Sequence, residues 1–197
     1  MGCDIHIYVE RKKNDKWYNC DYFIPSIKGG YERIETCGDR NYALFATLAD
    51  VRNYGNTKYI CEPKGFPDDA SDYVKDEYGT WFFDGHSCSY LTLQELIDFH
   101  NQGHPLKRRG MLSPEQRVEF YEGKIPDHWC QGTNKPDYEF VEWEEPNTVL
   151  VPLIEDLKRR ADQLGIIYDF MWDGRPESQQ EAYEKSANIR IVFWFDN

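Results

Sequence analysis

The sequence lacks long hydrophobic runs and is short of positive charge. Over 197 residues, 23 Lys and Arg stand against 35 Asp and Glu, which gives a formal net charge of −12 at pH 7. An acidic chain repels phosphate backbones and anionic lipid surfaces, so we expect neither duplex nucleic acid nor a membrane among its partners. Asp4, His6, Glu10 and Arg11 interrupt the apolar stretch near the start, and we therefore expect neither a signal peptide nor a transmembrane span.

Several short motifs are also missing. The six cysteines form no Cys-x-x-Cys pair, and without a signal segment this predicts reduced thiols in a cytoplasmic protein. Disulfides in a secreted protein are the alternative that an even cysteine count allows. Glycine-rich phosphate loops, Walker patterns, G-x-S-x-G elbows and dinucleotide fingerprints do not occur, which sets aside the enzyme classes that depend on them.

The sequence is rich in aromatic residues, which can form a hydrophobic core. Six Trp, 14 Tyr and 11 Phe make up 16% of the chain, while a mean hydropathy of −0.77 indicates a polar surface. A chain of this length buries most of the surface that it exposes when unfolded. With no internal repeat and no obvious boundary, residues 1–197 are predicted to form one domain.

Apolar periodicity predicts strands at both ends of the sequence. Residues 4–10 alternate and 17–22 return after a polar turn, the pattern of a β-hairpin, and 189–195 alternate in the same way. Shorter strands are expected at 80–83 and 166–172. Helical spacing and capping residues predict helices at 41–52, 67–76, 93–100, 113–123, 152–164 and 177–185. Residues 124–147 show no sustained period and are expected to form an ordered irregular loop.

Together these elements predict a single α+β domain. Its mixed or antiparallel sheet would carry the first and last strands side by side, with several short helices packed around it. In this arrangement we expect Asp4 and His6 to face the same cleft as His86.

The opening strand offers candidate metal ligands. Asp4 and His6 are two residues apart and therefore share one face of the strand, where a carboxylate oxygen and an imidazole nitrogen can approach one divalent ion. His86, at the break after the strand expected at 80–83, is the third candidate ligand. The alternative is that Asp4 and His6 form the solvated face of an edge strand and that His86 binds backbone.

Asp84 and Ser87 lie on either side of this histidine. Beside Gly85, which permits close approach, Asp84 is a candidate general base for a water molecule. Ser87 in the same break is a candidate ligand contact. An ordinary Asp-Gly turn is the alternative interpretation.

Two Arg-Asn pairs bracket the helix expected at 41–52. Guanidinium and amide groups suit a phosphate or a purine edge, so Arg40, Asn41 and Arg52 are candidate ligand contacts. Helix capping and surface ion pairing are the alternatives. The basic run at 107–109 is either an anion contact or a solvated connector, and we take the connector as the simpler interpretation.

Motifs at both ends and in the middle of the chain form a set: Met-Gly-Cys-Asp-Ile-His at 1–6, Arg-Asn-Tyr-Ala-Leu-Phe at 40–45, Gly-Phe-Pro-Asp-Asp-Ala-Ser at 65–71, His-Ser-Cys-Ser at 86–89 and Val-Phe-Trp-Phe-Asp-Asn at 192–197. This set resembles an uncharacterised family encoded by phages and bacteria. Cys88 stands where the family has a second histidine, and its thiolate can still ligate a metal. The resemblance implies a phage or mobile-element setting, in which small proteins bind or destroy the nucleotide signals of host defence.

From the residues and the resemblance we expect a phage-type protein of the host cytoplasm that hydrolyses a phosphoester in a nucleotide or cyclic-nucleotide signal. Asp4, His6 and His86 would hold a divalent metal ion, Asp84 would assist the water, and an arginine would hold the phosphate. One alternative is a protein that sequesters such a signal without chemistry. Another is an acidic inhibitor of a host defence protein. A homo-oligomer is compatible with each.

Overall fold

A computed structural model of the chain describes residues 2–81, 83–167 and 178–196. The strands are β1 (Asp4–Lys13), β2 (Lys16–Asn19), β3 (Phe23–Pro25), β4 (Tyr31–Arg33), β5 (His86–Thr92), β6 (Leu106–Leu112), β7 (Glu139–Glu145) and β8 (Ile189–Asp196). The helices are α1 (Tyr42–Ala49), α2 (Asp72–Thr80), α3 (Leu93–Asn101), α4 (Pro114–Tyr121), α5 (Val151–Gln163) and α6 (Gln179–Lys185), and a 3-10 turn covers Ser186–Asn188. The predicted α+β class is confirmed. None of the helices in these described ranges is long and apolar enough to cross a membrane.

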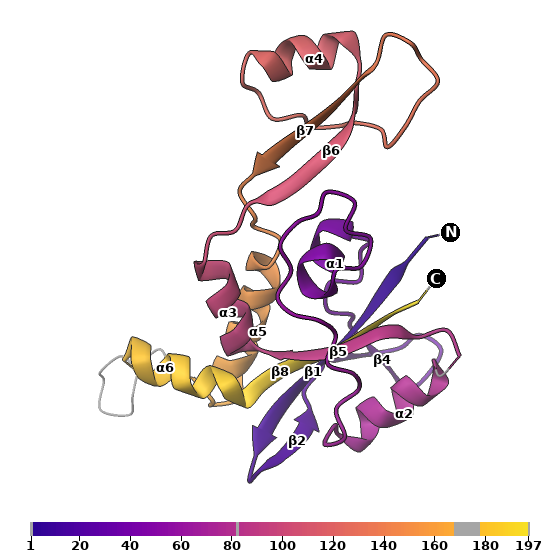
Figure 1. Ribbon diagram of the computed structural model, residues 1–197. Coiled ribbons are helices and arrows are strands. Elements are labelled where there is room, and N and C mark those ends of the chain that lie inside the picture. The colour runs from indigo at the N-terminus through magenta and orange to yellow at the C-terminus, as the bar shows by residue number, and fades with distance from the viewer. Residues whose placement is uncertain (1, 82, 168–177, 197) are drawn as a thin grey trace.

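The central sheet is built on β1 and β8. Its strands run in the order β2-β1-β8-β5, and each neighbouring pair is antiparallel. Asp4 lies opposite Asp196, which confirms the predicted contact between the first and last strands (Figure 1). Asn14 and Asp15 both have positive φ in the turn between β1 and β2, as a type I′ hairpin requires.

Helices cover both faces of this sheet. Successive residues of a strand point to opposite faces, so the two alternating sets of β8 enter different clusters, and both sets are buried. Phe193 and Phe195 pack in a core that α1, α3 and α5 also enter, whereas Val192 and Trp194 pack with Tyr8 and α2. Both halves of the core therefore depend on β8.

Residues 106–145 form an arm that projects from the sheet (Figure 1). Within it β6 pairs with β7, and α4 packs on this hairpin through Phe120, beside the buried residues Leu112, Val141 and Trp143. The irregular loop predicted at 124–147 is therefore wrong for residues 139–145, which form β7. The run at 107–109, which we interpreted as a solvated connector, belongs to strand β6. The alternation of Val141 and Trp143 with glutamates is too short to stand out among the surrounding Pro, Gly and Asp.

The elements predicted between residues 67 and 83 need correction. α2 begins at Asp72, later than predicted, and continues to Thr80. The strand predicted at 80–83 is therefore wrong for its described residues, since Trp81 and Phe83 lie in a turn. An aromatic run favours a strand only where it can pair, and here the Trp81 ring packs against His6 instead.

Local capping signals are confirmed where they were strongest. Thr92 with Glu95, and Ser113 with Gln116, form complete capping boxes at the start of α3 and α4. The predicted helices 152–164 and 177–185 correspond to α5 and α6. The strand predicted at 166–172 falls mostly outside the described residues.

Candidate functional site

Asp4 and Arg40, predicted for different roles, form an ion pair with each other. Arg40 Nη2 donates to Asp4 Oδ2 at 2.7 Å while Nε donates to Oδ1, so the contact is bidentate. The Arg40 guanidinium lowers the pKa of the Asp4 carboxyl. The Asp4 backbone N–H also donates to Asp196 Oδ1 at 3.2 Å. The Asp4 carboxylate and the Arg40 guanidinium are therefore already bound to each other at the start of β1.

The two predicted histidine ligands contact opposite faces of β8. The His6 ring lies 4.1 Å from Trp81 and 5.8 Å from Trp194, between centroids. The His86 ring lies 5.9 Å from Phe195. Because Trp194 and Phe195 are successive residues of one strand, these contacts belong to different faces.

Each histidine has one nitrogen that would suit a metal, since Nε2 of His6 and of His86 is buried without a hydrogen-bond partner in the described structure. His6 Nε2 lies 3.7 Å from Asp196 Oδ2. Across residues 2–81, 83–167 and 178–196, however, no group of three or more His, Cys, Asp or Glu side chains lies close enough to hold a metal ion. The three predicted ligands are not gathered at one point, and the divalent ion stays a prediction.

The other predicted site residues are also dispersed. Asp84 is exposed in the turn before β5. Ser87 has a φ of 49° at a register shift in β5, and its hydroxyl lies 3.1 Å from His86 Nδ1. Asn41 is the N-cap of α1, where its side chain accepts from the Leu44 N–H at 3.2 Å. Of the predicted ligand contacts, Arg52 alone lines the pocket described next.

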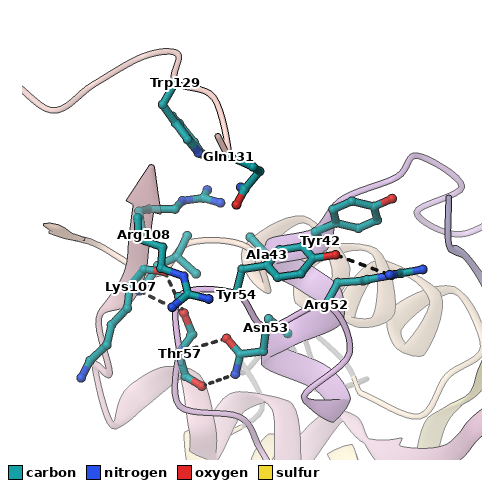
Figure 2. A pocket seen from close by; sticks show the side chains of 14 residues that line it. Tyr42, Ala43, Arg52, Asn53, Tyr54, Thr57, Lys107, Arg108, Trp129 and Gln131 are labelled. Atoms are coloured by element: carbon teal, nitrogen blue, oxygen red, sulfur yellow. Dashed lines mark hydrogen bonds between the residues drawn. The ribbon is translucent and has the colours of Figure 1, made fainter. Parts of the chain in front are cut away.

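That pocket, of about 130 Å³, lies between the loop after α1 and strand β6 of the arm (Figure 2). Its lining includes four cationic residues and no described carboxylate; the cationic residues are Arg52, Lys107, Arg108 and Arg109. Arg52 Nη1 donates to the Tyr54 hydroxyl at 3.4 Å, and Lys107 Nζ lies 3.8 Å from Glu144 Oε1. Three aromatic residues complete it: Tyr42, Tyr54 and Trp129. In the view of Figure 2, Trp129 and Gln131 enter from the arm above Tyr54 and Arg108.

The loop that carries Arg52 and Tyr54 has an unusual backbone. Asp50, Arg52 and Asn56 have φ of 60°, 54° and 57°, a left-handed conformation that Asp and Asn tolerate and arginine adopts only under constraint. Asn53 supplies that constraint. Its amide donates to Asp50 Oδ1 at 2.6 Å and to the Thr57 carbonyl at 2.8 Å, and it accepts from the Thr57 N–H at 2.8 Å.

Gly55 and Thr57 attach this loop to the arm. Thr57 Oγ1 donates to the Lys107 carbonyl at 3.1 Å and accepts from the Lys107 N–H at 3.0 Å. At Gly55 an added Cβ would lie 2.0 Å from the Lys107 carbonyl oxygen, so glycine is required for the close approach. The loop and β6 thereby hold the two walls of the pocket at a fixed separation.

The wall formed by the arm depends on Gly110. A Cβ there would lie 2.3 Å from Trp129 Cδ1, so the indole ring occupies the space that a side chain would need. The Arg108 guanidinium lies 5.2 Å from the centre of the Trp129 ring, a cation–π distance, and Nε donates to Glu145 Oε1 at 2.8 Å. Aromatic stacking and an ion pair therefore orient Arg108.

This arrangement can bind an anion that carries a planar group. Guanidinium groups bind phosphate or carboxylate oxygens through two parallel hydrogen bonds, and aromatic rings stack on a base. The rest of the acidic molecule opposes such a ligand, so the local cations must supply the attraction.

Sequence reasoning found Arg52 but missed Tyr54, Trp129 and Gln131. The signal that was available is the combination of Asn53, Gly55 and Asn56, since these residue types favour tight loops and left-handed backbone. Nothing local links this loop to Trp129, because the contact depends on how the arm folds back.

Comparisons with protein-family models, with curated proteins and with solved structures find no match to the chain.

Proposed function

We propose that the protein binds a small phosphorylated ligand of the nucleotide type in the pocket between the α1 loop and β6. The observation that carries this proposal is a pocket lined by four cationic and three aromatic residues, with no described carboxylate in its lining. In a chain with a net charge of −12, such a cluster opposes the overall field and favours an anionic ligand locally, although Glu145 and Glu144 already pair with Arg108 and Lys107.

The chemistry of the walls supports phosphate at one end and a ring at the other. Arg108 is oriented by Glu145 and Trp129. Arg109, the next residue of β6, is exposed and starts on the opposite face of the strand. The two guanidinium groups suit phosphate oxygens, whereas Tyr54 and Trp129 suit the flat face of a base. A hydrogen bond to a charged group contributes about 1.5–3 kcal/mol, so contacts to phosphate and stacking of the base are both needed to offset the cost of association.

The size of the pocket limits what enters it. Pockets for drug-sized ligands enclose about 300–1,000 Å³, and the 130 Å³ available here holds part of a nucleotide. A neighbouring hollow of about 290 Å³ shares Gly55, Lys107 and Arg108 with it and is also lined by Glu142, Trp143 and Glu144. We propose that a mononucleotide keeps its phosphate in the cationic pocket and extends an uncharged part into this neighbouring hollow.

Calorimetric titration with AMP, adenosine and inorganic phosphate tests the proposal. We expect AMP to bind, adenosine to bind at least tenfold more weakly, and binding to weaken as salt is raised. Arg108→Gln should reduce AMP affinity tenfold or more, the factor that corresponds to about 1.4 kcal/mol. Arg117→Gln is the matched control, because Arg117 lies on the same arm in an ion pair with Glu139 and outside the pocket lining. Equal affinities for both variants, or no binding of any nucleotide in a wider panel, would refute the proposal.

Sequestration without chemistry is the form that the geometry supports best, because the predicted metal ligands are not gathered in the described structure. The phage counter-defence setting is proposed from the family resemblance alone. Release of bound ligand by heat distinguishes the two forms: unchanged ligand supports sequestration, and a cleaved product supports hydrolysis. If a cleaved product is found, loss of cleavage in a His6→Ala variant would show that His6 in β1 takes part in the hydrolysis.

A further inference from the structure

A separate groove, of about 630 Å³, lies beside strand β2. It is lined by residues 15–19 on one side and by residues 69–73, which lead into α2, on the other. Successive strand residues point to opposite faces, so a hollow that touches all of 15–19 follows the edge of the strand and not one face. In Figure 1 this is the lower end of the molecule, where the β1–β2 hairpin lies beside the start of α2.

The two edges of the central sheet differ in how they are covered. At the β5 edge, the Gly65 N–H donates to the Cys88 carbonyl at 2.9 Å and the Lys64 N–H donates to Ser89 Oγ at 3.1 Å. β2 pairs with β1 on its inner side, and no strand of the described chain pairs with its outer side. An uncovered edge presents backbone N–H and carbonyl groups that can pair with another extended segment.

The side chains along this groove combine negative charge with aromatic surface. Asp15 and Asp72 are exposed, and Lys12 Nζ lies 3.6 Å from Asp15 Oδ1. The Asp69 carboxylate is largely exposed, although Oδ1 accepts from Arg190 and Oδ2 accepts from Trp17 Nε1 at 3.0 Å across the groove. Trp17 and Tyr73 line the walls. Lys16 is the one cation among the described lining residues, so aspartates outnumber it three to one.

Apolar surface continues beyond the groove. The Phe23 ring packs edge-on against Tyr73 at 5.7 Å. The β3–β4 hairpin also exposes several large apolar residues: Phe23, Ile24, Ile27 and Tyr31. Exposed apolar surface near an open strand edge is typical of a site that binds another polypeptide.

We propose that this groove receives an extended segment of another protein that carries lysine or arginine, which adds to β2 as a further strand. Main-chain pairing supplies the binding energy in strand addition, and side-chain pockets supply the specificity. The aspartates select a basic segment. A second copy of this chain fits poorly, because it would bring the same aspartates together and add another charge of −12.

The extent of β2 limits the strength of the interaction. Its four residues span about 13 Å at the usual rise per residue. So few main-chain hydrogen bonds predict weak, reversible binding. Electrostatic attraction should raise the association rate, and added salt should weaken the binding. This binding is independent of the nucleotide pocket, which lies at the base of the arm.

The test uses an end-blocked eight-residue peptide of alternating lysine and valine with a fluorescent label, titrated with the full-length protein. Polarisation should rise with protein concentration, and amide resonances of residues 16–19 should shift. A peptide with glutamate in place of lysine should not bind. Methylating alternate backbone nitrogens distinguishes strand addition from simple charge attraction: methylation of one alternating set should abolish binding, and methylation of the other set should preserve it.

Variants locate the site. Asp15→Asn with Asp72→Asn keeps the turn and the start of α2 but removes two charges, and should weaken peptide binding about five- to twentyfold, since exposed ion pairs are each worth up to about 1 kcal/mol. Glu119→Gln with Glu122→Gln removes the same charge from α4 and its C-cap and should leave binding unchanged. Equal effects of the two pairs, binding of the glutamate peptide, or binding that tolerates both methylation patterns would overturn the proposal. A dimer at micromolar concentration that occludes β2 would assign the groove to a second copy instead.

Discussion

Replacing Arg190 by methionine removes the cation that balances a carboxylate inside the sheet. Glu10 is 0% exposed and Arg190 is 2% exposed, and the two residues face each other across β1 and β8. Arg190 Nε and Nη2 both lie 2.8 Å from Glu10 Oε2. The other carboxylate oxygen accepts from the Ser71 N–H at 2.7 Å. After the substitution the carboxylate keeps this single backbone donor.

The magnitude follows from burial. Removing one partner of a buried ion pair costs about 3–5 kcal/mol, because the remaining charge is left without compensation. Arg190 also donates to Asp69 Oδ1 at 2.9 Å, and its guanidinium lies 3.9 Å from the centre of the Trp17 ring. These contacts are lost as well, so we expect the upper half of the range. That is a large fraction of the roughly 5–15 kcal/mol that stabilises a typical domain.

Urea unfolding monitored by far-ultraviolet circular dichroism measures the effect, provided that the slope with urea concentration is unchanged. A double variant, Glu10→Leu with Arg190→Met, should recover a substantial part of the loss, since an apolar pair of similar volume can replace a buried ion pair. Arg117→Met, which removes a half-exposed ion pair with Glu139, should cost less than about 1 kcal/mol. A loss below about 1 kcal/mol for Arg190→Met, or a double variant less stable than the single one, would show that the reasoning is wrong.

Three further changes test other parts of the structure. Burial raises the pKa of the Asp21 carboxyl from 3.8 to about 6. Between these two pKa values the folded protein keeps a proton that the unfolded chain releases. The unfolding free energy should therefore fall by up to about 3 kcal/mol as pH rises from 4 to 6. Asp21→Asn should lack that decline in urea titrations at each pH, and an unchanged pH profile would contradict it. Gly55→Ala should lower the unfolding free energy by about 1–3 kcal/mol and weaken AMP binding, as measured by thermal unfolding and calorimetry. Gly132→Ala is the control and should change neither quantity, because an added Cβ there meets nothing within 4 Å. Ser113→Ala removes the N-cap of α4 and should cost about 1 kcal/mol in urea unfolding, and no loss would show that the cap is dispensable.

The parts of the fold that could be predicted are those coded by residues close in sequence. The capping box of Thr92 and Glu95 involves contacts within one helical turn, and the start of α3 is where that signal puts it. The alternation of β1 and β8 likewise predicts two strands that share a core. By contrast, β7 was missed, because a short alternating stretch has little weight beside the Pro-rich and Gly-rich residues before it.

The candidate site could be predicted only in fragments, because its walls come from distant segments. Arg52 is predicted as a ligand contact and Arg108 only as one alternative for the 107–109 run, and nothing in the sequence places them at one pocket until the loop after α1 is attached to β6 through Thr57 and Lys107. Arg40 shows the opposite case. It has the chemistry of a phosphate ligand, but the fold brings Asp4 to it and uses the charge in an ion pair. Residue type limits what a side chain can bind, and tertiary structure decides what it does bind.

The position of β8 between β1 and β5 has a consequence for synthesis on the ribosome. Asp4 and Asp196 are 192 positions apart, yet they meet at one end of the sheet. A nascent chain therefore carries β1 and β5 together for about half of its elongation without the strand that joins them, and their apolar faces and open edges stay accessible. The central sheet closes only after β8 has left the exit tunnel. Contacts so distant in sequence favour slow closure, which makes the emerging chain a natural client for chaperones.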